Sequence, residues 1–166
     1  MNYETYIGID IGRYGAICIK RPEKITVFEM PSKKKGLVFI PDGKKIHQIL
    51  SLCEGEKVFA TVEEQHSRKG QDAKSTFTAA RYYESVLTAI DILGYKYKTV
   101  DPKKWKNKYN LDSMKIKSII KVAYMFPEAY NEYIKQGKSG NFESSEDGKC
   151  EAILLADYGE NVINSV

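Results

Sequence analysis

The 166-residue sequence is 42% hydrophobic and 29% charged, a composition typical of one globular domain spanning 1–166. No apolar run reaches the ~20 residues of a membrane helix, and the start "MNYETY" lacks a signal-peptide pattern, so we expect a cytoplasmic protein without a membrane partner. Three cysteines, an odd number without close spacing, argue against a disulfide framework and a zinc site. The net charge of +4, carried mainly by lysine, permits binding to nucleic acid.

The first part of the chain predicts strands. Residues 3–10, 15–20 and 24–30 are apolar or alternating and rich in β-branched side chains, with Gly and Pro between them. They predict a meander of three antiparallel strands. Residues 43–53 then place apolar side chains at helical spacing, and a short apolar strand at 57–64 ends in two acids.

The second part of the chain is mainly helical. Apolar residues recur every three or four positions over 75–93, which predicts an amphipathic helix, and a short strand follows at 95–100. Two further helices are predicted over 113–126 and 146–163, joined by a polar loop at 135–145. This order of elements predicts an α/β layered domain with a mixed sheet.

One acid interrupts the first strand. In "YIGIDIGRYGAICIK", Asp10 stands between two isoleucines with Gly8, Gly12 and Gly15 around it. An ordinary β-hairpin would also use Asp and Gly, but this acid falls inside the apolar run rather than at the turn. Because buried carboxylates are rare unless they are paired or metal-bound, Asp10 is a candidate ligand for a metal or a phosphate.

A second acid follows the strand at 57–64. Either Glu63 or Glu64 lies at its carboxyl end, and a parallel neighbour of the first strand would bring that end beside Asp10. The alternative is a solvated strand end. If the strands are neighbours, two carboxylates converge at one edge of the sheet.

The last helix carries two more acids. Glu151 directly precedes the apolar run "AILLA", and Asp147 lies four residues earlier on the same helical face. Two like charges at this spacing repel, and a cation between them would relieve the repulsion. Asp147 also fits a capping box with Ser144, a purely structural role, whereas Glu151 has no such alternative.

These acids predict a site for hard cations. The cluster offers only oxygen ligands, so we expect Mg²⁺ or Mn²⁺ rather than zinc. Two such ions about 4 Å apart can activate a water on one side of a phosphodiester and stabilise the leaving oxygen on the other. A protein that acts in this way needs no covalent nucleophile.

Four motifs in this order resemble those of the phage and bacterial RuvC-type Holliday-junction resolvases of the ribonuclease H-like superfamily: "GIDIGRYGAI", "VEEQHSRKGQDAKSTF", "VDPKKWK" and "DGKCEAILLADYG". The resemblance covers nearly the whole chain. It implies a ribonuclease H-like fold, with a mixed five-stranded sheet of three antiparallel and then parallel strands flanked by helices. It further implies a homodimeric, metal-dependent endonuclease that resolves four-way or other branched DNA junctions by paired symmetric nicking.

The resemblance also assigns the site by position. Asp10 matches the aspartate that binds both metals, and Glu63 rather than Glu64 matches the glutamate after the fourth strand. Asp147 and Glu151 match the two acids of the final helix.

The final helix departs from the family in two ways. The chain has Glu151 where many resolvases have Asp, and its two acids are four residues apart where some relatives have three. Glu146 is therefore an alternative to Asp147 as the additional ligand.

Basic residues near these motifs are candidate contacts to DNA phosphates, although a solvated loop or helix face would also account for them. The candidates are His66, Arg68, Lys69, Lys103, Lys104, Lys106, Lys108 and Lys115. Among them stand Trp105 and Tyr109, which are either core anchors or stacking platforms for unpaired bases; we favour the core for Trp105. The helix at 75–93 would supply the dimer contact by similarity, or else pack on the core.

Two other functions compete with the nuclease. A module that binds branched DNA without cutting it would use the same basic residues and keep the acids for structure. The first motif also resembles the phosphate-binding hairpin of the actin and sugar-kinase fold, but 166 residues leave no room for the second domain of that fold.

Overall fold

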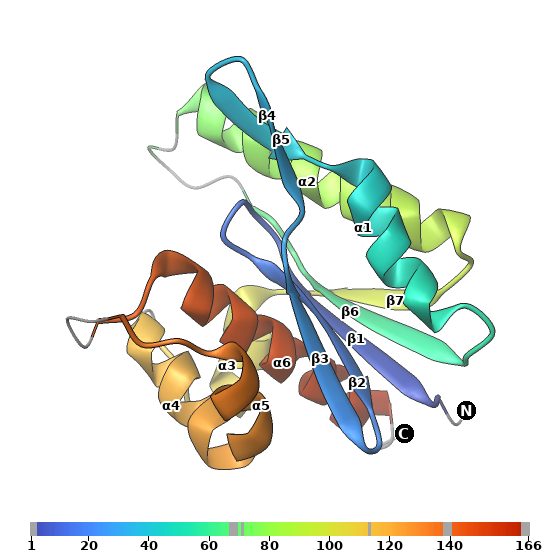
Figure 1. Ribbon diagram of the computed structural model, residues 1–166, viewed down its shortest axis with the longest axis vertical. Helices are drawn as coiled ribbons and strands as arrows, with labels where there is room; N and C mark the ends of the chain where they lie inside the picture. The colour runs from blue at the N-terminus through green and yellow to red at the C-terminus, as the bar shows by residue number, and fades with distance from the viewer. Residues whose placement is uncertain (1–2, 67–69, 71, 113, 138–140, 164–166) are drawn as a thin grey trace.

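A five-stranded sheet forms the centre of the protein, in the order β3-β2-β1-β6-β7 (Figure 1). The computed structural model describes residues 3–66, 70, 72–112, 114–137 and 141–163. The strands are β1 (Thr5–Asp10), β2 (Ala16–Arg21), β3 (Lys24–Glu29), β6 (Val58–Glu63) and β7 (Lys96–Val100). β1 pairs antiparallel with β2 and parallel with β6, which confirms the predicted meander and mixed sheet.

This topology places the ends of several strands at one edge. Because β1, β6 and β7 run parallel, Asp10 and Glu63 both lie at the carboxyl edge of the sheet. Ala16 opposite Asp10, and Glu29 opposite Ala16, belong to the same edge. The first strand and the strand at 57–64 are therefore parallel neighbours, as predicted.

Helices cover both faces of the sheet. On one face lie α1 (Gly43–Leu50), the short 3₁₀ helix η1 (Ser51–Cys53) and α2 (Ala73–Ile92); on the other lie α3 (Pro102–Lys108), α4 (Lys115–Met125), α5 (Pro127–Tyr133) and α6 (Ser144–Ile163), as Figure 1 shows. Each face has its own apolar core. The three cysteines are buried in these cores.

β1 separates the two cores through alternate residues. Ile7 and Ile9 are fully buried in the core beneath α1 and α2, while Gly8 faces α6. A Cβ on Gly8 would lie 2.1 Å from the carbonyl oxygen of Ala152, so the absent side chain lets α6 pack directly on the strand. This close approach brings the acids of α6 to Asp10.

Four elements were not predicted from the sequence. A two-stranded hairpin of β4 (Ser32–Lys35) and β5 (Val38–Pro41) leaves the sheet after β3, and α3 and α5 are short helices within segments without a predicted element. α3 begins at Pro102 after the N-cap Asp101, whose side chain accepts from the backbone N–H of Lys103. That Asp-Pro pair was the available signal for α3.

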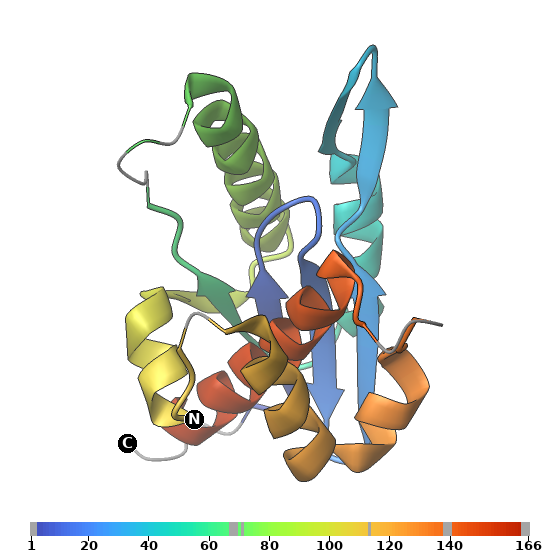
Figure 2. The ribbon, with the colours of Figure 1, turned by 90° about the vertical axis from the view of Figure 1, so that its left-hand side faces the viewer.

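α2 packs on the core along only part of its length. Val86 and Ile90 are fully buried against the sheet, so its C-terminal half is a core helix. Its N-terminal half projects beyond the end of β1 (Figure 2), and Phe77 there is 67% exposed.

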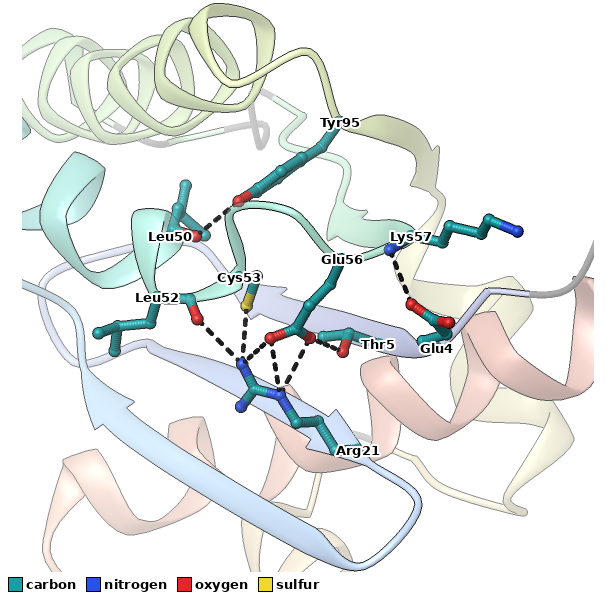
Figure 3. Close-up of polar contacts among 9 residues, drawn as sticks. All are labelled: Glu4, Thr5, Arg21, Leu50, Leu52, Cys53, Glu56, Lys57 and Tyr95. Atoms are coloured by element: carbon teal, nitrogen blue, oxygen red, sulfur yellow. Dashed lines mark hydrogen bonds and ion pairs between the residues drawn. The ribbon is translucent and has the colours of Figure 1, made fainter.

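Polar contacts hold the opposite end of the sheet, far from Asp10 (Figure 3). Nη2 of Arg21 lies 2.7 Å from Oε1 of Glu56, a carboxylate that also accepts from the hydroxyl of Thr5. The guanidinium of Arg21 lowers the pKa of Glu56 below its usual value. The hydroxyl of Tyr95 donates to the carbonyl oxygen of Leu50 at 3.0 Å. These bonds join β1 and β2 to the segment before β6, and the residue before β7 to the end of α1.

No helix within the described ranges has the length and apolarity needed to cross a membrane.

Candidate metal centre

Three carboxylates from distant parts of the chain meet at the carboxyl edge of the sheet. Asp10 ends β1, Glu63 ends β6, and Glu151 lies in the second turn of α6. One oxygen of each lies within 4.8 Å of the other two. The convergence predicted from the sequence is therefore present, and Glu63 rather than Glu64 takes part in it.

Asp147 flanks this cluster. Its Oδ2 lies 3.0 Å from Nζ of Lys115, and its charge raises the pKa of both Asp10 and Glu151 by repulsion. Among the described residues, its buried Oδ1 has no hydrogen-bond partner. A buried carboxylate oxygen without a partner carries a desolvation cost that a bound cation would offset.

Glu146 has a different environment. Its carboxylate accepts from the backbone N–H of Lys135 at 2.8 Å and from Nζ of Lys149 at 2.8 Å. These contacts tie the start of α6 to the segment after α5. Asp147, whose charge reaches Asp10 and Glu151, is therefore better placed than Glu146 as the additional ligand.

Lys106 is the cation nearest to the three carboxylates. Its Nζ lies 2.8 Å from Oε1 of Glu151 and 4.0 Å from Oε1 of Glu63. Burial by itself would lower the pKa of Lys106, but the carboxylates of Glu151, Glu63 and Asp10 outweigh it, so this pKa is raised. The ammonium therefore stays charged and neutralises part of the cluster.

Trp105 also contacts Glu63. The indole is fully buried, as favoured from the sequence, and its Nε1–H donates to Oε1 of Glu63 at 3.2 Å. No pattern in the sequence predicts this bond, because it depends on how α3 packs against β6. Tyr109, on the same side, is also buried and donates from its hydroxyl to Asp157 at 2.7 Å.

The electrostatics of the cluster favour a divalent cation. Desolvation raises the pKa of Asp10 well above its usual value, and repulsion from Glu63 and Glu151 raises it further. Desolvation also raises the pKa of Glu151, and Lys106 offsets this only in part. Two ammonium groups, those of Lys106 and Lys115, thus face four carboxylates and leave the acids undercompensated. An all-oxygen set of this charge fits Mg²⁺ or Mn²⁺.

The basic residues predicted to contact DNA have several environments. His66 is half exposed, with Nε2 3.4 Å from a carboxylate oxygen of Asp101, while Arg68 and Lys69 lie outside the described residues. Lys103 and Lys104 are exposed on α3. The other three are Lys106 in the acidic cluster, Lys108 with Nζ 5.2 Å from the ring centre of Tyr158, and Lys115 beside Asp147.

Replacing Lys106 with Met should destabilise the metal-free protein more than the metal-bound protein. The change leaves the three carboxylates without their nearest cation, and we expect a loss of about 1–2 kcal/mol, or roughly 3–8 °C in Tm. Mg²⁺ should then raise the Tm of the variant more than that of the wild type. Thermal melts with Mg²⁺ and with chelator measure both effects.

Lys104→Met, on the exposed side of the same helix, is the matched control and should leave both melts unchanged. If K106M and the wild type gain the same Tm from Mg²⁺, then Lys106 and the metal do not compete for these carboxylates.

Known structures share this fold over most of the chain. Thermus thermophilus RuvC in complex with a Holliday junction substrate aligns with a TM-score of 0.60 at 13% identity, over 96% of this chain and 96% of that chain. A second Thermus thermophilus RuvC structure aligns with a TM-score of 0.54 at 15% identity, over 95% and 96%. The yeast mitochondrial Holliday junction resolvase Ydc2 aligns with a TM-score of 0.53 at 15% identity, over 94% and 78%.

No protein-family model matches the sequence, and no curated protein sequence matches it. The likeness is therefore one of three-dimensional structure. The chain has the ribonuclease H-like fold of the RuvC-type Holliday-junction resolvases.

Proposed function

We propose that this protein is a metal-dependent endonuclease that resolves four-way or other branched DNA junctions by paired symmetric nicking. The observation that carries the proposal is the convergence of Asp10, Glu63 and Glu151 within 4.8 Å at the carboxyl edge of the sheet. The fold shared with junction resolvases supports the choice of branched DNA over other phosphodiesters.

Within this proposal, the acidic residues bind the metal and a neighbouring side chain orients one of them. Asp10, Glu63 and Glu151 would hold Mg²⁺ or Mn²⁺, with two ions in each site, and Asp147 would add a fourth carboxylate. Binding of the ions would displace Lys106 from Glu151. When bound, these ions supply water activation and charge neutralisation at the scissile phosphodiester. Trp105 orients the carboxylate of Glu63 through its indole N–H.

A homodimer would give one site for each of two symmetric nicks. The exposed Phe77 on the projecting half of α2 supports this helix as the contact between subunits, because a large exposed aromatic side chain suits an interface. Exposed Lys103 and Lys104 on α3 are placed to bind phosphates, and binding should weaken steeply with salt as counterions are released.

The test is incubation of the purified protein with a synthetic four-way junction and with a linear duplex of matched sequence, in Mg²⁺, Mn²⁺ or chelator. We expect paired nicks on the junction only, and only with metal. Equal cutting of the duplex would show a general nuclease. Tight binding to the junction without cutting in either metal would show a recognition module instead.

A further inference from the structure

The β4–β5 hairpin is a basic element that the proposed metal centre leaves unused. Lys33, Lys34 and Lys35 follow one another along β4 and are all exposed. Because side chains alternate between the faces of a strand, the hairpin is basic on both faces. Leu37 at its tip is 98% exposed, so the described fold makes no use of the tip.

The hairpin starts at the same edge of the sheet as the acids. β3 ends at Glu29, which pairs with Ala16 of β2, and Ala16 in turn pairs with Asp10 of β1. The chain enters β4 only three residues after Glu29. Figure 2 shows the hairpin projecting past the end of β1, beyond the loop that follows Asp10. Its lysines therefore extend outward from the edge that carries the candidate metal centre.

The base of the hairpin is held in place. Ser32 Oγ lies 2.7 Å from the hydroxyl of the fully buried Tyr82 on α2, and the backbone N–H of Asp42 donates to the carbonyl oxygen of Pro31 at 2.9 Å. The guanidinium of Arg13, in the loop after Asp10, lies 3.6 Å from the ring centre of Phe39 on β5. The projection is thus anchored to α2 and to the loop of the metal centre.

A pocket connects the hairpin with the start of α6. It has a volume of about 490 Å³ and is lined by residues that include Arg13, Tyr14, Phe39, Lys45 and Ser145. Arg13 and Lys45 outnumber the acid Glu29, whose carboxylate pairs with Nζ of Lys149 at 3.0 Å, so the lining carries net positive charge. Tyr14 and Phe39 add aromatic surface, and this combination binds a nucleic-acid backbone and its bases. Gly148 of α6 packs on the loop after Asp10: a Cβ there would lie 2.2 Å from the carbonyl oxygen of Tyr14 and 3.1 Å from Oδ2 of Asp10, so the pocket borders the acids.

We propose that the β4–β5 hairpin and this pocket form a DNA-binding arm that holds the duplex flanking the scissile phosphate. This inference rests on the proposed function and names a surface for its substrate. Charge complementarity selects the occupant, since three adjacent lysines, Arg13 and Lys45 face a polyanion. The arm lies apart from the lysines of α3, so it adds a second set of phosphate contacts.

The test compares two variants with the same loss of charge. One variant replaces Lys33, Lys34 and Lys35 with Gln. The control replaces Lys24, Lys57 and Lys96 with Gln. These three lysines are exposed at the opposite end of the sheet, where β3, β6 and β7 begin. Junction affinity is measured in chelator over a series of salt concentrations. Thermal melts check that each variant is folded, and Lys34→Glu alone serves as a second variant.

The arm predicts that the hairpin variant binds the junction about tenfold more weakly or worse and that its plot of log K against log salt is shallower by about 2–3. The control should match the wild type. The arm would be overturned if the two variants bound the junction with the same affinity and salt slope. It would also be overturned if the hairpin variant changed its oligomeric state but kept the wild-type salt slope. Either result counts against the arm even if the wild type nicks junctions. A wild type that neither binds nor nicks junctions would instead overturn the proposed function.

Discussion

Glu151→Gln is expected to lower metal-dependent nicking of a four-way junction by about 10²–10⁴-fold, because several kcal/mol of charge stabilisation are lost with one ligand. The substitution keeps the shape of the side chain but removes the charge that contributes to the cluster with Asp10 and Glu63. Junction binding should persist, since it depends on basic residues elsewhere. Nicking rates at saturating protein, together with binding in chelator, separate the two effects.

Glu64→Gln is the matched control for this prediction. Glu64 is adjacent to Glu63 in the sequence, but it is partly exposed and its carboxylate lies 3.8 Å from His66 instead of in the cluster. The control should nick at the wild-type rate. Normal nicking by the E151Q variant would remove Glu151 from the site.

Gly8→Ala is expected to cost about 3 kcal/mol or more of the free energy of unfolding, equivalent to roughly 6–12 °C in Tm. The new Cβ would lie 2.1 Å from the carbonyl oxygen of Ala152 and 2.2 Å from the backbone nitrogen of Ala156. Both are backbone atoms of α6, so no side chain can rotate away, and the helix must shift. Thermal or denaturant unfolding measures the loss.

The shift should also impair nicking, because α6 carries Glu151. Gly43→Ala is the control: its added Cβ meets no atom within 4 Å, and Gly43 lies at the start of α1, where the change should be neutral or slightly stabilising. If G8A unfolds with the same Tm as G43A, α6 does not pack on β1 as closely as described.

The convergence of the three acids could be predicted from the sequence because they are attached to strongly patterned elements. Asp10 and Glu63 end strands whose apolar runs identify them, and parallel pairing brings such ends together. Glu151 begins an apolar helical run that has to be buried. The local sequence pattern thus predicts each element that carries an acid, and the element determines where the acid lies.

The partners of those acids could not be predicted in the same way. Trp105 and Lys106 lie on α3, a helix of seven residues that is too short to show periodicity. Lys106 resembles the lysines around it in sequence, and only the packing of α3 against β6 and α6 turns it toward Glu151. The β4–β5 hairpin could not be predicted because its lysines have low strand propensity.

The most direct test of the account is a crystal structure of the protein grown with Mn²⁺ and measured for anomalous scattering. The account predicts anomalous peaks within bonding distance of carboxylate oxygens of Asp10, Glu63 and Glu151, with Lys106 displaced from Glu151. Mn²⁺ bound elsewhere on a protein that nicks junctions, with these three carboxylates still paired only to Lys106, would contradict it.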